Sequence, residues 1–253
     1  MEVKGPVVLL TDFGWDVYVG VMKGVIYSIC PRALVIDLAH HVTPQNVREG
    51  AWLLMMNYPY FPPESIFVAV VDPGVGSARK AVAVSAGGYY FIGPDNGLLY
   101  PAATKAGVKR VVELEVPEGA SLTFHGRDVF APAAARLACG TPFADLGRPG
   151  NLSVRLDFYL SGREGEVVTI DRFGNVITNL PPLPGCSGYD VTLLRKEGVY
   201  FESALPFFAT YAEAPEGVLF VITGSCGTLE LSVKDGSAAS RLRAKVADRV
   251  IIA

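Results

Sequence analysis

Three aspartates stand at or near the ends of continuous apolar runs. The runs VVLLTD and SIFVAVVD close on Asp12 and Asp72, and ALVIDL carries Asp37 one residue before its end. Open α/β sheets bind ligands outside the carboxyl ends of their strands, which would place Asp12 and Asp72 at the rim of one crevice. Aspartates there also start turns or cap helices. Spacing weighs these two interpretations about equally for Asp12 and Asp72, and favours the turn for Asp37.

A cation follows the second of these acids. In DPGVGSAR, Arg79 stands seven residues after Asp72, and a permanently charged guanidinium beside that carboxylate would keep it ionised. The segment lacks the Gly-Lys-Ser/Thr ending of a phosphate loop. Its glycines are therefore expected to let the backbone approach a ligand or close a tight loop. Taken alone, Arg79 would be an ordinary solvated loop arginine.

His125 precedes a glycine in TFHGRDVF, where a strand is expected to turn into a helix. A lone histidine is more often structural, but an imidazole near an acid and an arginine can handle a water proton at neutral pH. Arg127 and Asp128 are predicted to pair locally at the helix end. The three histidines lack zinc spacing, and the adjacent His40 and His41 would point to opposite faces of a strand, so no metal is expected.

Two segments of the second half also gather polar groups. In IDRFGNVITNL, a hairpin turn explains the Gly-Asn pair that ends on Asn175, whereas Asp171 and Phe173 would suit a zwitterionic ligand beside a flat ring. In GSCGTLELSV, Ser225 lies in a glycine-bounded turn and Glu230 interrupts an apolar strand. An inward acid in a strand usually has a partner, and an ammonium group would serve.

The elements that must position these residues change character along the chain. The first half alternates continuous apolar runs with helical stretches, which predicts a largely parallel sheet covered by helices. Helices are expected over residues 18–30, from a cap at residues 43–44 onward, and over residues 126–140. The runs AVAVSA and YYFIGP are predicted to pair as a hairpin at the edge of the sheet. Turn-rich sequence then leads into short strand-like segments. We therefore predict an α/β domain over residues 1–150 and a smaller all-β domain over residues 151–253.

Composition excludes several classes of protein. The chain has 253 residues, of which 50% are hydrophobic and 19% charged, as in a well-packed globular protein. Its net charge of -3 and its lack of a Lys/Arg cluster argue against a nucleic-acid partner. No apolar run approaches the ~18 residues that span a bilayer, so no membrane partner is expected. The start is unlike a signal peptide and the four cysteines are widely separated, which predicts a cytoplasmic protein.

The motifs together resemble a known family, the S-adenosyl-L-methionine hydroxide adenosyltransferases, which form the hydrolase branch beside the fluorinase and chlorinase. The resemblance runs nearly end to end and in order, over the segments LTDFGWDVYVGVMKGVIYSICP, DLAHHVTPQNVREGAWLL, YFPPESIFVAVVDPGVGSAR, YFIGPDNGLL, TFHGRDVFAPAAARL, IDRFGNVITNL and GSCGTLELSV. It implies hydrolysis of S-adenosylmethionine to adenosine and methionine by attack of water or hydroxide at ribose C5′. It also implies no cofactor, and a homotrimer whose active sites lie between subunits.

The resemblance assigns roles residue by residue. It implies that Asp72, Arg79 and His125 activate the water, that Asp12 holds the ribose hydroxyls, and that Asp72 also contacts the substrate. The other implied contacts belong to the all-β domain. They are Asn175, Ser225 and Glu230 at the methionine end, Asp171 and Phe173 close by, and the backbone of Val233 near the adenine.

Two alternatives remain open. A halogenase of the same fold would use chloride or fluoride, but the resemblance implies that halogenases lack the Asp-Arg-His set and carry an inserted loop after the third strand. Here only SARKAVAV separates Gly76 from the next strand. A protein that binds S-adenosylmethionine or adenosine without turnover is the other alternative. The sequence leaves open which sulfonium epimer is preferred, with a lean toward the R epimer.

Overall fold

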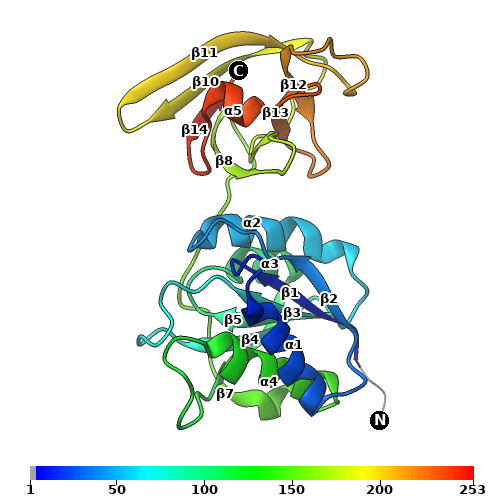
Figure 1. Cartoon of the computed structure of the whole chain (residues 1–253), viewed down its shortest axis with the longest axis vertical. Coiled ribbons are helices and arrows are strands. Elements are labelled where there is room, and N and C mark those ends of the chain that lie inside the picture. Colours follow the sequence, from blue (N-terminus) through cyan, green and yellow to red (C-terminus); the bar gives the residue numbers. More distant parts are fainter. Residues whose placement is uncertain (1–3) are drawn as a thin grey trace. The chain divides into compact units, whose positions relative to one another are not determined.

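The computed structural model describes residues 4–253, which form two compact units that join in the chain between Asp157 and Phe158 (Figure 1). The first unit contains one sheet whose strands lie in the order β2-β1-β3-β5-β4-β6-β7. Their bounds are β1 (Val7–Thr11), β2 (Val35–Ala39), β3 (Ile66–Val70), β4 (Ala81–Ala86), β5 (Tyr89–Pro94), β6 (Val108–Leu114) and β7 (Gly147–Pro149).

The sheet is mixed, so the prediction of a largely parallel sheet is right for one half only. The pairs β1–β2, β1–β3 and β3–β5 are parallel, whereas β4–β5, β4–β6 and β6–β7 are antiparallel. A parallel pair needs a long crossover connection, while the two-residue turn between β4 and β5 permits only an antiparallel pair. The antiparallel half of the sheet therefore begins at the tight turn between β4 and β5.

The predicted hairpin of β4 and β5 is present, but its predicted place at the sheet edge is wrong. Strand β5 pairs with β3 on its other side, and β4 pairs with β6. The sequence analysis missed β6 and β7. The first three residues of β6 are exposed, and its residues Lys109 and Arg110 conceal the apolar pattern that marks the other strands.

Helices cover both faces of this sheet (Figure 1). Leu9 of β1 joins a core with Met22 of α1 (Val17–Ile29) and Ala134 of α4 (Ala131–Ala138). Leu10, the next residue, points to the opposite face, where it lies near Gly50 of α2 (Val47–Asn57). Because successive side chains of a strand alternate between faces, burial on both faces requires a continuous apolar run. The same opposite face also carries α3 (Tyr100–Ala106), which packs on α2.

The helix predicted over residues 18–30 is confirmed, but the cap predicted at residues 43–44 is wrong. Helix α2 begins at Val47, and the side-chain oxygen of Asn46 accepts a hydrogen bond of 3.1 Å from the backbone N–H of Glu49. Helix α2 starts later than predicted because Gln45 has a left-handed backbone, with a φ of 66°, which interrupts any helix that would start before it.

The helix predicted over residues 126–140 has two parts. A π-helical turn, η2 (Gly126–Phe130), leads directly into α4, and Gly140 ends the helix with a φ of 94°. Such turns occur often at functional sites. The predicted local pair is present, since Nε of Arg127 lies 2.6 Å from Oδ1 of Asp128. Two short 3-10 turns, η1 (Tyr58–Tyr60) and η3 (Phe143–Leu146), complete the first unit.

The second unit is built on an antiparallel sheet with the order β11-β10-β14-β8-β9-β13-β12, as the predicted all-β domain requires. One short helix, α5 (Ala238–Leu242), was not predicted. The strand bounds are β8 (Glu164–Ile170), β9 (Val176–Thr178), β10 (Gly188–Arg195), β11 (Gly198–Pro206), β12 (Leu219–Thr223), β13 (Leu229–Val233) and β14 (Arg249–Ile252).

One glycine joins the two loops of the first unit on which the predicted chemistry depends. Gly76 lies between Asp72 and Arg79 with a φ of 75°, and a Cβ placed on it would lie 2.3 Å from the carbonyl oxygen of Leu122. Leu122 lies three residues before His125. The absence of a side chain at Gly76 therefore lets the loop after β3 pack on the segment that carries the histidine.

Gly76→Ala should destabilise the protein more than a matched glycine substitution. Gly88→Ala is the control, because Gly88 also has a positive φ, of 92°, but faces open space. The control should cost about 1–2 kcal/mol for backbone strain, and Gly76→Ala about 1–3 kcal/mol more for the overlap with Leu122. Thermal or urea unfolding measures both. Equal losses would show that the close approach contributes nothing.

Candidate active site

Asp72 and Arg79 form a two-pronged ion pair beyond the end of β3. The guanidinium Nε donates to Oδ1 of Asp72 at 2.9 Å, and Nη2 contacts Oδ2. The two side chains are only 5% and 9% exposed. A planar guanidinium held by both carboxylate oxygens is fixed in orientation as well as in charge. The solvated loop arginine that the sequence also allowed is therefore not what the structure contains.

His125 completes a contact chain with this pair. Its Nδ1 lies 2.8 Å from Nη2 of Arg79, and the residue is buried. A guanidinium only donates, so Nδ1 accepts and the ring proton resides on Nε2. Burial lowers the pKa of His125, and the positive charge of Arg79 lowers it further, while the charges of Asp72 and Asp128 oppose this in part. The ring is therefore neutral at pH 7.

Two donors of this set have no acceptor among the described residues. They are Nε2 of His125 and Nη1 of Arg79, and both are buried. Buried polar groups in folded proteins are nearly always hydrogen-bonded. An atom with lone pairs bound beside them, such as the oxygen of water or hydroxide, would satisfy these N–H groups. Two fixed donors favour the more negative form of such an oxygen.

Asp12, Asp72 and His125 line one cavity of about 380 Å³ in the first unit. The structure thus brings the two strand-end acids to one crevice, as their positions in the sequence predict. Oδ2 of Asp12 accepts a hydrogen bond of 2.8 Å from the backbone N–H of Gln45, another lining residue. The sequence analysis did not single out Gln45. Gln45 was difficult to predict from the sequence, because it is not one of the strand-end acids and reaches the cavity through its left-handed backbone.

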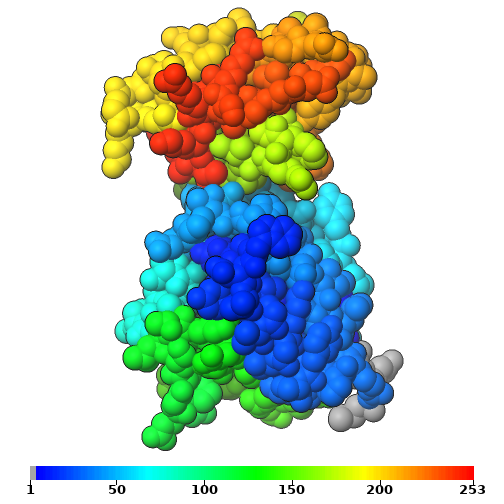
Figure 2. All heavy atoms as spheres, in the orientation of Figure 1, coloured from blue at the N-terminus to red at the C-terminus, as the bar shows by residue number. Residues whose placement is uncertain are grey.

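Aromatic rings form part of the cavity lining. The ring of Phe124 lies 5.1 Å from that of Tyr18 and 5.8 Å from that of Phe13, measured between centroids. All three residues line the cavity, and the sequence analysis missed them. Each lies next to a predicted site residue or at the start of a helix. In such positions an aromatic residue is more simply expected to pack in the core. Nearby, Trp15 and Val17 are strongly exposed, and the blue N-terminal segments form much of the visible face of this unit in Figure 2.

In the second unit, Asp171 organises the turn between β8 and β9. Its Oδ1 accepts from the backbone N–H groups of Phe173 and Asn175, each at 2.9 Å, and its Oδ2 accepts from Nδ2 of Asn175 at 2.8 Å. These bonds explain why an aspartate stands there, which the plain hairpin argument did not. They also leave the ring of Phe173 mostly exposed, at 71%.

Glu230 lies buried on β13, and its carboxylate packs over Gly224. Burial raises the pKa of Glu230, and the negative charge of Asp171 raises it further. The hydroxyl of Tyr211 lies 3.5 Å from Oε2 of Glu230 and was not foreseen. Two neighbouring acids in a buried place would be stabilised by a cation between them.

The remaining predicted contacts of the second unit differ in exposure. Ser225 is exposed in the turn between β12 and β13, and Val233, at the end of β13, is buried. The backbone of Val233 pairs with Leu219 and forms a bridge to Gly236. The first unit thus supplies three predicted residues to one cavity, with Arg79 bonded to two of them, and the second unit groups its acids around the β8–β9 turn.

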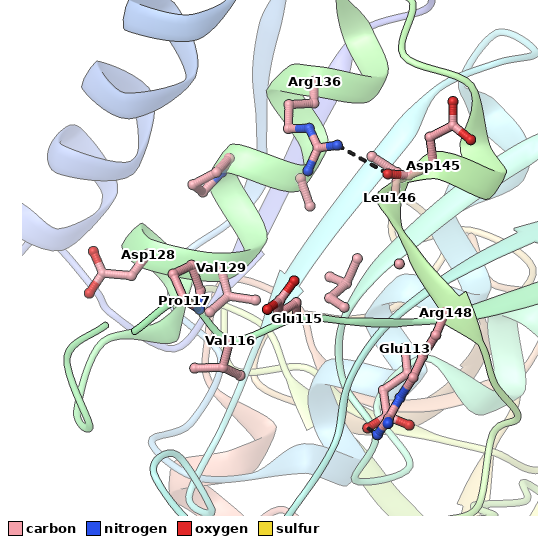
Figure 3. A pocket seen from close by; sticks show the side chains of 14 residues that line it. Glu113, Glu115, Val116, Pro117, Asp128, Val129, Arg136, Asp145, Leu146 and Arg148 are labelled. Carbon is pink, nitrogen blue, oxygen red and sulfur yellow. Dashed lines mark hydrogen bonds and ion pairs between the residues drawn. The ribbon is translucent and has the colours of Figure 1, made fainter. Parts of the chain in front are cut away.

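A larger cavity of the first unit, of about 890 Å³, contains none of the predicted site residues (Figure 3). Both arginines that line it already have partners. Nη2 of Arg148 lies 2.7 Å from Oε1 of Glu113, and Nη2 of Arg136 donates to the carbonyl of Asp145 at 3.0 Å. The cavity therefore lacks the buried, unsatisfied donors that distinguish the site around His125.

Within residues 4–253, no group of three His, Cys, Asp or Glu side chains is placed to hold a metal ion. The helices of that part of the chain are all too short or too polar to cross a membrane.

Comparison with known proteins identifies the family. The model of the SAM hydroxide adenosyltransferase N-terminal domain matches residues 7–147, and that of the corresponding C-terminal domain matches residues 165–251. The chain belongs to the SAM hydroxide adenosyltransferase family. The two family domains fall within the two compact units of the structure.

Relatives within the adenosyltransferase family carry informative names. The chain is 42% identical to the (R)-S-adenosyl-L-methionine hydrolase of Thermus thermophilus, over 95% of this chain and 96% of that one. It is 44% identical to a protein of the same name from Salinispora arenicola, over 95% and 94%. A fluorinase of Actinopolyspora mzabensis is 29% identical, over 89% of each chain. The crystal structure of an uncharacterized conserved protein from Thermotoga maritima has a TM-score of 0.88 at 35% identity, over 98% of this chain and all of that one.

The contact between Arg79 and His125 predicts a change in the titration of the histidine. In the unchanged protein, the pKa of His125 should lie below the ordinary value of about 6.5. Arg79→Gln removes the nearby positive charge and should raise it. NMR titration of the ring signals, assigned with His125→Asn, measures both values. Arg148→Gln, in the other cavity, should change nothing. A pKa that stays constant or falls in Arg79→Gln would contradict the assigned contact.

Proposed function

We propose that this protein hydrolyses S-adenosyl-L-methionine to adenosine and L-methionine. The observation that carries the proposal is the pair of buried, unsatisfied donors on Arg79 and His125, next to a cavity that Asp12, Asp72 and His125 line. Hydrolysis needs an oriented water or hydroxide, and those donors are suited to hold its oxygen. The family membership and the names of the relatives at 42% and 44% identity support the same reaction.

The reaction is a displacement at ribose C5′. A lone pair of the water or hydroxide oxygen forms the O–C5′ bond while the C5′–S bond breaks, and the sulfur keeps the electron pair as the neutral thioether of methionine. If the nucleophile enters as water, one proton leaves to solvent. The sulfonium leaves readily, so no acid is needed at sulfur. The main task is to hold the nucleophile in line with the C5′–S bond in a site with little water.

The residues of the first unit divide this task. His125, through Nε2–H, and Arg79, through Nη1–H, bind the nucleophilic oxygen. Asp72 fixes the guanidinium through two contacts and balances its charge. In this arrangement His125 acts as a donor, because its other nitrogen already accepts from Arg79. The carboxylate of Asp12 accepts charge-assisted hydrogen bonds from the ribose hydroxyls.

The residues of the second unit bind the methionine end. The ammonium group would lie near Glu230 and Asp171, whose mutual repulsion and burial it would relieve. Asn175 and Ser225 supply hydrogen bonds to the amino-acid part, and the exposed ring of Phe173 packs nearby. The backbone of Val233 lies near the adenine. The proposed substrate is the R sulfonium epimer, in keeping with the names of both hydrolases.

We further propose that the protein is a cytoplasmic homotrimer with each active site between two subunits. The predicted catalytic residues belong to one unit of the chain and the methionine contacts to the other, as a site shared between copies would require. No cofactor takes part in the proposed reaction.

A halide-using enzyme is the second candidate, because the same two donors could hold chloride or fluoride. The fluorinase relative is more distant, at 29% identity. Incubation with S-adenosylmethionine in the presence of either halide, followed by chromatography, separates the candidates. Adenosine with methionine supports hydrolysis, and a 5′-halogenated nucleoside supports the halogenase. Intact substrate after long exposure to stoichiometric protein would indicate a binding protein without turnover.

Asp72→Asn should reduce turnover by about 10²–10⁴-fold while changing the substrate KM little. The amide keeps the size of the carboxylate but presents an N–H to a guanidinium that can only donate, so Arg79 loses its orientation. Steady-state kinetics, with circular dichroism to verify folding, measure the effect. Glu113→Gln, which removes the charge of a more exposed acid–arginine pair in the other cavity, should retain normal turnover. Normal turnover in Asp72→Asn would refute the mechanism.

The shared site predicts complementation between two defective variants. Asp72→Asn damages the first unit and Glu230→Gln the second, so each homotrimer alone should be impaired. After mixing and subunit exchange, roughly a quarter of the sites would combine two intact halves if the halves come from different subunits at random. Activity should therefore return at low substrate concentration, and sedimentation should show trimers. A monomer with full activity would refute the assembly.

A further inference from the structure

His40 holds the turn that carries Asp12 from two sides. Its backbone oxygen accepts a hydrogen bond of 2.6 Å from the N–H of Gly14. Its side-chain Nδ1 lies 2.9 Å from Oγ1 of Thr11, a fully buried residue at the end of β1. The same Oγ1 accepts from the backbone N–H of Phe13 at 3.2 Å. One residue that follows β2 thus contacts the turn both before and after Asp12.

The far side of the His40 ring is also held. Nε2 lies 2.9 Å from Oδ1 of Asp37, and Oδ2 of Asp37 accepts from Nζ of Lys23, on α1, at 2.6 Å. Partial burial opposes ionisation of Asp37, but the bonds from Lys23 and His40 lower its pKa, so it is a carboxylate at neutral pH. A carboxylate only accepts, which places the ring proton on Nε2 and leaves Nδ1 to accept from the hydroxyl of Thr11.

The resulting chain of hydrogen bonds has one consistent direction. The ammonium group of Lys23 donates to Asp37, Nε2 of His40 lies at ion-pair distance from the same carboxylate, and Thr11 donates to His40. The N–H of Phe13 then donates to Thr11. Nε2 of His40 lies close to Asp37 but has no hydrogen-bond partner among the described residues, so the network rigidifies its surroundings through Nδ1 and the backbone oxygen of His40. The element that it rigidifies is the turn of residues 11–14.

His40 itself is not among the residues that line the 380 Å³ cavity, whereas Asp12 and Phe13 are. Any effect of His40 on a ligand in that cavity must therefore pass through the turn. A carboxylate that receives two vicinal hydroxyls must be held in one orientation, because small displacements lose much of the benefit of directed contacts. Gln45 bonds Oδ2 of Asp12 from the side of α2, and His40 holds the backbone from the side of β2.

We propose that His40 is a positioning residue for Asp12, and that its imidazole is required for selective binding of the ribose hydroxyls. The proposal rests on the proposed function only in taking Asp12 as the ribose contact. A general structural role for His40 makes a different prediction, since it would weaken all ligands of the cavity alike. Selectivity for the hydroxyls is therefore the quantity that separates the two roles.

The test compares adenosine with 2′,3′-dideoxyadenosine by calorimetry on the full-length protein. The Kd of the dideoxy compound divided by the Kd of adenosine reports how much the hydroxyls contribute to binding. Asp12→Asn should reduce this ratio by about 10–100-fold, and His40→Phe should reduce it by at least about tenfold while the Kd of the dideoxy compound changes little. In the double variant the ratio should fall no further than in Asp12→Asn, because both changes remove the same contact.

A matched pair of variants separates the two ends of the imidazole. The side-chain amide of His40→Asn reaches the position of Nδ1 and can still accept from Thr11, whereas that of His40→Gln reaches the position of Nε2 and Asp37. Since only the Nδ1 contact touches the turn, His40→Asn should retain most of the selectivity and His40→Gln should lose it. His41→Phe, at the neighbouring exposed histidine, is the control and should leave the ratio unchanged.

Several outcomes would overturn the proposal. The proposal is wrong if His40→Phe, in protein that melts cooperatively, lowers the affinities for both nucleosides by the same factor and so leaves their ratio at the wild-type value. Equal ratios for His40→Asn and His40→Gln would also refute it. If the wild type does not discriminate between the nucleosides, both the ribose role of Asp12 and the role of His40 fail. If discrimination behaves as expected but S-adenosylmethionine is not consumed, only the proposed reaction fails.

Discussion

The ion pair between Asp72 and Arg79 is the interaction on which the candidate site depends. Arg79 stands on a loop without regular secondary structure, and its orientation comes from the two oxygens of Asp72. Through Nη2 it also decides which nitrogen of His125 carries the proton. Removing either partner would leave a charge with few ways to reach water, because both side chains are nearly buried. The pair thus sets the charge, the geometry and the tautomer of the site at once.

The fold explains how these residues meet although they are far apart in the sequence. Parallel pairing of β1 with β3 brings Asp12 and Asp72 to the same edge of the sheet, since both follow the carboxyl ends of their strands. His125 arrives from a different part of the chain, just before η2, on a segment that packs on Gly76. The parallel half of the sheet therefore carries the predicted chemistry. The antiparallel half, from β4 to β7, completes the unit without contributing a predicted site residue.

The sequence predicted what local pattern can encode. Continuous apolar runs predicted β1 and β3 because both faces of those strands are buried, and they also predicted β2, which is only half-buried at the sheet edge. The strand-end rule placed Asp12 and Asp72 together. Prediction from the sequence failed where tertiary context decides. Strand β6 has an exposed, charged start, and the helix cap moved to Asn46 because Gln45 adopts a left-handed backbone. Whether Arg79 would be solvated or paired depended on how the loop closes, which spacing alone does not contain.

The tautomer of His125 limits how the site can work. While Nδ1 accepts from Arg79, Nε2 carries a proton and acts as a donor, so the ring holds the nucleophile instead of deprotonating it. Its lowered pKa keeps it in this neutral form, and protonation would bring a second positive charge next to Arg79. A site of this kind stabilises an oxygen anion through fixed donors and relies on a reactive substrate for the remainder of the driving force. A sulfonium substrate meets that requirement, because its leaving group departs without protonation.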